Sequence, residues 1–280
     1  MGQLQKRSYS RNGTGRQKQI IKLFKLKLYS PVLFLVFSLL FCEVAAQNDK
    51  MALVKGGVYL PLYGAENKTV KVEPFLMDIY PVTNTDYLKF VEEYPQWKKS
   101  NVKPLFADKS YLTNWKDDET FQGLPNAPIT NVSWFAAKKY CECQGKRLPT
   151  MDEWEFAAMA NEKMQDARRI ETYNQYILNW YETPKTFNNP IGETFKNYWG
   201  IYDLHGLVWE WTLDFNSVLI SGESRKDVDK DSNLFCGSAA IGASDLMNYA
   251  AFMRYAFRGS MKARYSSQNL GFRCAKDVEN

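Results

Sequence analysis

The chain has 280 residues, of which 45% are hydrophobic and 15% aromatic, and this composition is typical of a globular protein with a substantial core. Its formal net charge is +5, but residues 1–46 contain eight Lys or Arg and one Glu, so the remainder contains 28 basic and 30 acidic residues. The body of the protein is therefore close to neutral, and we expect no nucleic-acid partner.

The basic N-terminus is followed by an apolar run, Val32–Cys42, and by a small residue, Ala46. This order is typical of a secretory signal peptide, and the run is shorter than the ~20 residues of a transmembrane helix. We therefore predict a signal peptide over residues 1–46 and an exported mature protein, periplasmic or secreted, with no membrane attachment beyond that peptide. An uncleaved membrane anchor is the alternative.

The first part of the mature chain predicts strands, one helix and a long loop. Residues 51–62 are interpreted as a strand, a Gly-Gly turn and another strand, and residues 75–80 as a further strand. Thr83 or Asn84 then caps a helix with one apolar face. Residues 95–128 show no sustained period and are expected to form a long ordered loop.

Two capped helices follow. Ser133 is a good N-cap for a helix over residues 134–143, and Thr150 with Glu153 forms the capping box of the next helix. The neighbouring carboxylates, Glu155 among them, are explained by capping and by exposure to solvent.

Beyond residue 160 the periodicity is weaker. Residues 179–199 are expected to be irregular, residues 252–258 alternate as a strand does, and residues 270–275 predict a short final strand. Many turns and few long elements, without a separating linker, predict one compact α+β domain over residues 51–280.

The mature chain has four cysteines and one histidine. An even number of cysteines in an oxidising compartment predicts at least one disulfide. The spacing of Cys141 and Cys143 does not fit a zinc knuckle, and His205, which we expect on the surface or in a loop, cannot supply a histidine-rich metal site or a Ser-His-Asp set.

Four segments occur in the order and spacing of one known family: FLMDIYPVTNTDYLKFV (75–91), PITNVSWFAAKKYCECQGKRLPTMDEWEFAA (128–158), GIYDLHGLVWEWTLD (200–214) and NLGFRCA (269–275). Together they resemble the formylglycine-generating enzyme, or sulfatase-modifying factor, family. The resemblance runs from about Met51 to the end. It implies a compact fold of the C-type-lectin-like type with little regular secondary structure.

The best-known members of that family oxidise a sulfatase cysteine to formylglycine with copper, oxygen and a cysteine pair. The positions that correspond to the pair are Ile241 and about Ala250, and neither carries sulfur. The nearby Met247 and Met253 are interpreted as core residues. Iron-dependent relatives need three histidines. We therefore expect neither copper nor iron, and copper-dependent formylglycine formation is not expected.

The resemblance also pairs Cys141 with Cys274 in a disulfide. The other two cysteines of the mature chain, Cys143 and Cys236, either pair with each other or remain separate thiols.

Four residues correspond to the calcium loop of the family: Asp203, Gly206, Val208 and Glu210. Two side chains and two backbone carbonyls that face one point suit Ca²⁺, which prefers oxygen ligands. The alternative is a structural turn that holds no ion.

Three residues correspond to the substrate cleft of the family: Trp209, Ser238 and Arg258. An arginine beside aromatic residues can instead be a stacked, structural group, and both interpretations of Arg258 remain open.

These features lead to two functional hypotheses. In the first, the protein is an accessory or maturation factor, for example of the nitrite-reductase accessory type, that binds an exported protein or peptide. It either assists an exported metalloenzyme or modifies its partner by chemistry unlike that of the copper enzymes. In the second, it is a non-catalytic, lectin-like binding or structural module of the cell envelope.

Overall fold

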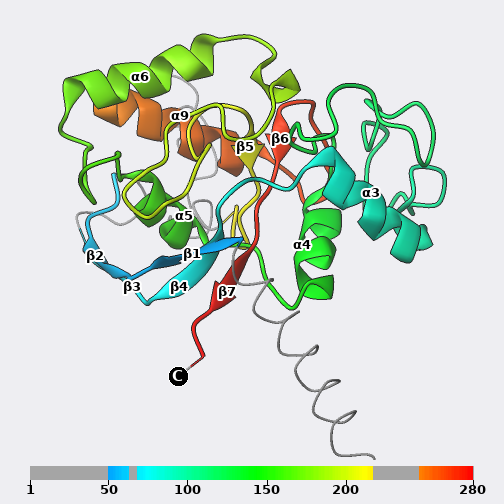
Figure 1. Cartoon of the computed structure of the whole chain (residues 1–280), viewed down its shortest axis with the longest axis horizontal. Helices are drawn as coiled ribbons and strands as arrows, with labels where there is room; N and C mark the ends of the chain where they lie inside the picture. The colour runs from blue at the N-terminus through cyan, green and yellow to red at the C-terminus, as the bar shows by residue number, and fades with distance from the viewer. Residues whose placement is uncertain (1–49, 63–67, 217–245, 280) are drawn as a thin grey trace, which may run out of the picture. The chain divides into compact units, whose positions relative to one another are not determined.

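The computed structural model describes residues 50–62, 68–216 and 246–279 (Figure 1). These residues belong to one compact unit, Lys50–Asn280, of mixed helices and sheets. The predicted signal peptide lies outside the described residues, as do Cys236, Ser238 and Ile241. No helix in the described ranges has both the length and the hydrophobicity that crossing a bilayer requires.

The main sheet joins the two ends of the described chain. Strand β4 (Phe75–Asp78) lies between β1 (Met51–Val54) and β7 (Ala275–Asp277), and both pairings are antiparallel. On one face of the sheet, residues such as Val54 of β1 and Met77 of β4 are fully buried. The C-terminal segment is thereby fixed next to the start of the domain.

One strand prediction is confirmed and one needs correction. Residues 51–62 contain two strands, as predicted, and the second, β2 (Gly57–Tyr59), pairs with β3 (Val70–Val72). The expected single strand over residues 270–275 is wrong, because β6 (Leu270–Gly271) pairs in parallel with β5 (Trp209–Glu210) while β7 begins four residues after β6 ends.

The three capped helices are confirmed. They are α3 (Asn84–Glu93), α4 (Trp134–Cys143) and α5 (Met151–Ala158). The Thr83 hydroxyl caps α3, Ser133 caps α4, and α5 begins with the full Thr150–Glu153 capping box. The loop after α3 contains a short 3₁₀ helix, η1 (Pro95–Trp97), turns and isolated β-bridges such as Trp115–Phe121.

Two further helices were not predicted. Helix α6 (Glu171–Glu182) lies where the periodicity of the sequence is weak, and its last four residues fall in the segment expected to be irregular. Helix α9 (Leu246–Ser260) replaces the strand predicted over residues 252–258. The two helices pack against each other (Figure 1). Residues 250, 254 and 258 of α9 are buried at helical spacing. Because two of them are arginines, the sequence does not show the apolar periodicity by which a buried helix face is recognised.

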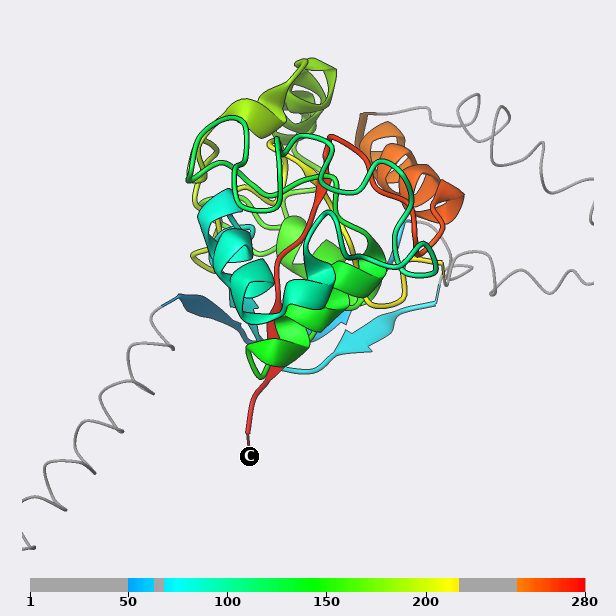
Figure 2. The ribbon, with the colours of Figure 1, turned by 90° about the vertical axis from the view of Figure 1, so that its right-hand side faces the viewer.

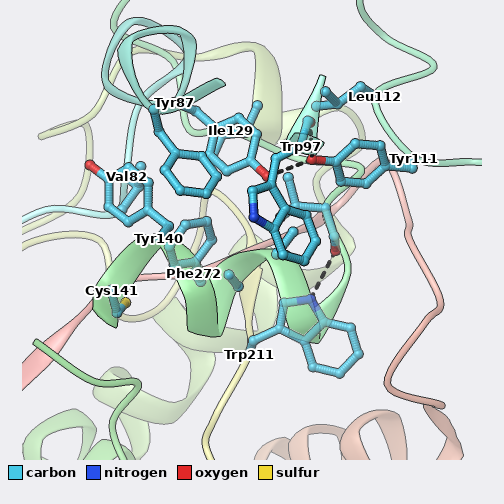
Figure 3. Packing of buried hydrophobic residues seen from close by; sticks show 14 of the residues in the cluster. Val82, Tyr87, Trp97, Tyr111, Leu112, Ile129, Tyr140, Cys141, Trp211 and Phe272 are labelled. Atoms are coloured by element: carbon cyan, nitrogen blue, oxygen red, sulfur yellow. Dashed lines mark hydrogen bonds between the residues drawn. The ribbon is translucent and has the colours of Figure 1, made fainter. Parts of the chain in front are cut away.

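The largest apolar cluster lies among α3, α4 and the chain before β7, and aromatic rings fill most of it (Figure 3). The ring of Tyr87 is 6.3 Å from that of Phe272, and the indole N–H of Trp211 donates to the carbonyl of Val132 at 2.9 Å. The predicted disulfide, Cys141–Cys274, is present beside this cluster. It ties α4 to the last part of the chain.

Cys143 lies at the end of α4, where it is a half-buried free thiol. Its suggested partner, Cys236, lies outside the described residues, so whether the two cysteines pair stays a prediction.

Candidate functional site

A cavity of about 420 Å³ lies beside Trp209. Its walls come from the end of α6, the 3₁₀ helix η2 (Thr186–Asn188), the turn before β5 and the residues before β6. Both aromatic and polar side chains line it, among them Trp180, Tyr181, Lys185, Trp209, Gln268 and Asn269. The volume is that of a typical ligand pocket.

Trp209 is fixed from several sides. Its backbone N–H donates to the Asn269 carbonyl at 2.8 Å, next to the β5–β6 pairing. The ring of Phe257, from α9, stacks on it at 4.8 Å between centroids, and the ring of Tyr181, from α6, lies at the same distance. The shape of the cavity therefore depends on where α6 and α9 pack.

Arg258 does not line this cavity, although the resemblance placed it in the same cleft as Trp209. Its guanidinium is buried, donates to Glu155 at 2.7 Å and lies 4.5 Å from the centre of the Trp154 ring. These contacts match the structural interpretation of Arg258. The third cleft residue of the prediction, Ser238, lies outside the described residues.

Glu155 is the centre of a buried ionic cluster, which contradicts the expectation that its carboxylate is exposed. Arg254 donates to it through Nε at 2.9 Å and Nη2 at 2.7 Å, and Arg258 donates to it as well. Burial alone would raise the pKa of Glu155, but the charges of the two arginines outweigh burial and lower it to about 2. This one carboxylate therefore ties α9 to α5.

His205 lies in a loop, which is one of the two expected places, but its side chain is buried and is not on the surface. Its Nε2 lies 2.7 Å from the Ala158 carbonyl, which can only accept, so Nε2 carries the proton. Nδ1 then accepts from the Tyr181 hydroxyl at 3.2 Å. Burial, followed by the charge of Arg254, lowers the pKa of His205 to about 3. His205 is neutral at neutral pH and supports Tyr181 from behind.

The two carboxylates of the predicted calcium loop have other partners. Asp203 accepts backbone N–H groups from Gly192 and from Thr194, the latter at 3.0 Å. Glu210, fully buried, accepts from Arg273 Nε at 2.9 Å and from the Trp154 indole at 2.7 Å. A carboxylate that is already neutralised by a buried guanidinium is a poor ligand for a divalent cation.

The backbone of this loop also has a structural role. Gly206 has a φ of +143°, and a Cβ there would lie 2.7 Å from the Thr194 side chain and 3.1 Å from the Trp180 ring. Across the described part of the chain, no three His, Cys, Asp or Glu side chains are grouped so that they could hold a metal. The two carboxylates of the predicted calcium loop thus have protein partners, and calcium binding stays a prediction.

The resemblance places the cysteine pair of the copper-dependent members at Ile241 and at about Ala250, and only the second of these positions is described. Ala250 lies on α9, where its methyl group is buried in an apolar cluster with Ile177 and Leu178 of α6. The residue is therefore part of the α6–α9 packing and does not face the cavity beside Trp209. The other position, Ile241, is outside the described residues.

The family model of the sulfatase-modifying factor enzyme 1-like domain matches residues 37–278. The chain belongs to this family. The resemblance inferred from the four sequence segments and the α+β fold class are thus both confirmed.

Two bovine members of the sulfatase-modifying factor family show how closely the active and inactive forms are related to this chain. It is 29% identical to an inactive Cα-formylglycine-generating enzyme 2 of Bos taurus, over 74% of this chain and 79% of the relative. It is 27% identical to the formylglycine-generating enzyme of the same organism, over 76% of this chain and 68% of the relative. Among solved structures, PvdO from Pseudomonas aeruginosa is similar over 81% of this chain and 94% of its own, with 18% identity and a TM-score of 0.48.

The sequence did not reveal the buried charged and polar residues that support the walls of the cavity from the protein interior. Glu155, Arg254 and His205 come from three separate segments, and no local motif connects them. The i and i+4 spacing of Arg254 and Arg258 was the only available signal, since it places both guanidiniums on one helix face.

Proposed function

We propose that this protein is a non-oxidising member of the sulfatase-modifying factor family that binds a segment of an exported partner protein in the cavity beside Trp209. In this proposal it acts as an accessory or maturation factor, for example for a metalloenzyme. The observation that carries the proposal is an accessible cavity lined by aromatic and amide side chains. The buried Ala250, which lies at about the position where the resemblance places a cysteine of the copper-dependent members, supports it.

The chemistry of the cavity supports binding over redox catalysis. Among the described residues, those that line it include no Cys, His or Met, so this part of the wall offers no soft donor for Cu(I). Gln268 and Asn269 supply amide groups, and Trp180 and Trp209 supply apolar contact area. Amides and rings of this kind suit a peptide segment, whose backbone needs hydrogen bonds and whose side chains need apolar contacts.

The comparisons agree with such a role without assigning it. The chain is about as similar to an inactive relative as to an active one, so identity alone does not separate the two possibilities. The residues at the site are the better guide, because function depends on the site and not on the fold.

The proposal can be tested by cross-linking from the rim of the cavity. A photoreactive residue placed at Lys185 or at Gln268, which are both exposed on the cavity wall, is expected to capture the same exported protein in the cells that produce this chain. The matched control is Lys71, whose side chain is 71% exposed on β3 and does not line the cavity. Equal capture of that protein from Lys71 would contradict the proposal.

A second measurement separates binding from oxidation. The purified protein, supplied with copper and oxygen, is expected to leave a cysteine-containing sulfatase peptide unchanged when the peptide is examined by mass spectrometry. Conversion of that cysteine to the aldehyde would overturn the non-oxidising part of the proposal. Failure of the cross-links to converge on one partner would instead favour the envelope module.

A further inference from the structure

Two neighbouring segments of the chain carry four exposed cations and the most exposed large apolar side chain of the described residues. Leu105 is 72% exposed, and the cations are Lys103, Lys109, Lys262 and Arg264. We refer to these five residues as the cationic patch. It combines two segments that are more than 150 residues apart in the sequence.

Backbone hydrogen bonds hold the two segments together. The N–H of Asp108 donates to the carbonyl of Arg264 at 2.9 Å and joins the two segments directly, and the N–H of Asn131, from the chain just before α4, donates to the carbonyl of Ser267 at 2.9 Å and fixes the chain that follows the second segment. Within the first segment, a turn is closed by a bond of the same length from the N–H of Phe106 to the Lys103 carbonyl. Figure 2 shows the chain that leaves α9 running toward β6 past the loops that precede α4. The patch is therefore built on a fixed backbone.

The charges of the patch are not neutralised by its neighbours. No ion pair involves any of its four cations within residues 50–62, 68–216 and 246–279. The ammonium of Lys262 lies 5.6 Å from the centre of the Tyr265 ring, and the carboxylate of Asp108 accepts from the Ser110 N–H. Four positive charges and one negative charge thus gather on a body that is otherwise close to neutral.

The patch continues into the cavity beside Trp209 along one short stretch of chain. Arg264 precedes Gln268, which lines the cavity, by four residues. Four residues span at most about 14 Å even when fully extended. A single extended peptide of a few residues can therefore contact both the cavity and the patch.

We propose that the cationic patch binds an acidic segment of the partner polypeptide, adjacent to the part that enters the cavity. This inference rests on the proposed function. The Lys and Arg side chains attract the carboxylates of the partner and orient it, and Leu105 contacts an apolar residue among them. Long-range attraction of this kind is screened by salt, so the interaction weakens as ionic strength rises.

The test uses a labelled polyglutamate peptide, with a Gln/Ser peptide of equal length as reference and fluorescence anisotropy as readout. We expect the polyglutamate peptide to bind in a salt-sensitive way and the Gln/Ser peptide not to bind. Reversal of the four charges in the variant Lys103→Glu, Lys109→Glu, Lys262→Glu and Arg264→Glu should raise the dissociation constant about tenfold or more. The matched control reverses four other exposed cations that have no ion pair in the described ranges: Lys55, Lys68, Lys163 and Arg169.

Two outcomes would overturn the inference. Equal weakening in the patch variant and in the control would mean that only net charge matters. Binding to vesicles of phosphatidylglycerol, with no binding of the peptide, would assign the patch to a membrane surface. Both outcomes leave the proposed function intact, because the cross-links from Lys185 and Gln268 report on the cavity independently of the patch. If those cross-links fail while the peptide binds the patch, the proposed function alone is lost.

Discussion

The region around the disulfide and the region around Glu155 are held together by opposite kinds of interaction. Beside Cys141–Cys274, α3, α4 and the final part of the chain bury mainly aromatic and aliphatic side chains. Between α5, α6 and α9, two arginines, one glutamate and a neutral histidine are buried together. The first region distributes its stability over many contacts, whereas the second depends on a single carboxylate.

This difference bears directly on the cavity. Trp209 stacks on Phe257 of α9 and contacts Tyr181 of α6, and both helices belong to the ionic region. The apolar region ties α4 to the last part of the chain, while the ionic region positions the helices that contact Trp209. Damage to the two regions should therefore have different consequences for binding.

Removal of the disulfide is expected to have the largest effect on stability. The bond joins residues 133 positions apart, and in the chain-entropy model a loop of this length contributes about 4–5 kcal/mol. The double variant Cys141→Ala, Cys274→Ala should lose roughly that much free energy of unfolding in urea. A loss far below 2 kcal/mol would show that the apolar packing alone holds this region together.

The substitution Glu155→Gln tests the ionic region. It leaves two buried guanidiniums without their counter-charge, so we expect a loss of about 3 kcal/mol in the free energy of unfolding and an altered fluorescence of Trp209. The matched control is Glu153→Gln on the same helix. There a glutamine can keep the capping box, and Arg147 retains Asp277, so the loss should stay below about 1 kcal/mol. Similar losses in the two variants would refute the special role of Glu155.

Acidification should weaken the ionic region through His205. The pKa of the histidine is lowered from 6.5 to about 3, so between these values the unfolded chain binds a proton that the folded protein excludes. Stability is complete above pH 6.5 and falls with decreasing pH, by about 2 kcal/mol at pH 5. The measurement is urea unfolding at both pH values. The variant His205→Asn should lack this part of the pH dependence, and an unchanged dependence would show that other groups cause it.

Removal of calcium should have the smallest effect. The carboxylates of Asp203 and Glu210 are held by backbone amides, by Arg273 and by Trp154, so chelation with EDTA is expected to leave the melting temperature nearly unchanged. The resemblance to the calcium loop of the family leads to the opposite expectation. Metal analysis together with the melting curve distinguishes them, and stoichiometric calcium with a lower melting point after chelation would restore the calcium site.

The elements that the sequence predicted correctly are those whose signals are local. The caps Thr83, Ser133 and Thr150 act on amides within three residues, so they can be recognised without knowledge of the fold. The segments shared with the family carried the fold class and the pair Cys141–Cys274. Trp209, which these segments assign to a substrate cleft, lines a cavity, and its contact with a substrate stays a prediction.

What the sequence alone determined was therefore the family and the capped helices. Only the tertiary structure decided that α9 is a helix, that Glu155 and His205 are buried, and that Arg258 turns away from the cavity. The physical reason is that a cap is satisfied by its own neighbours, whereas a charge enters the interior only when distant segments bring its partner to it.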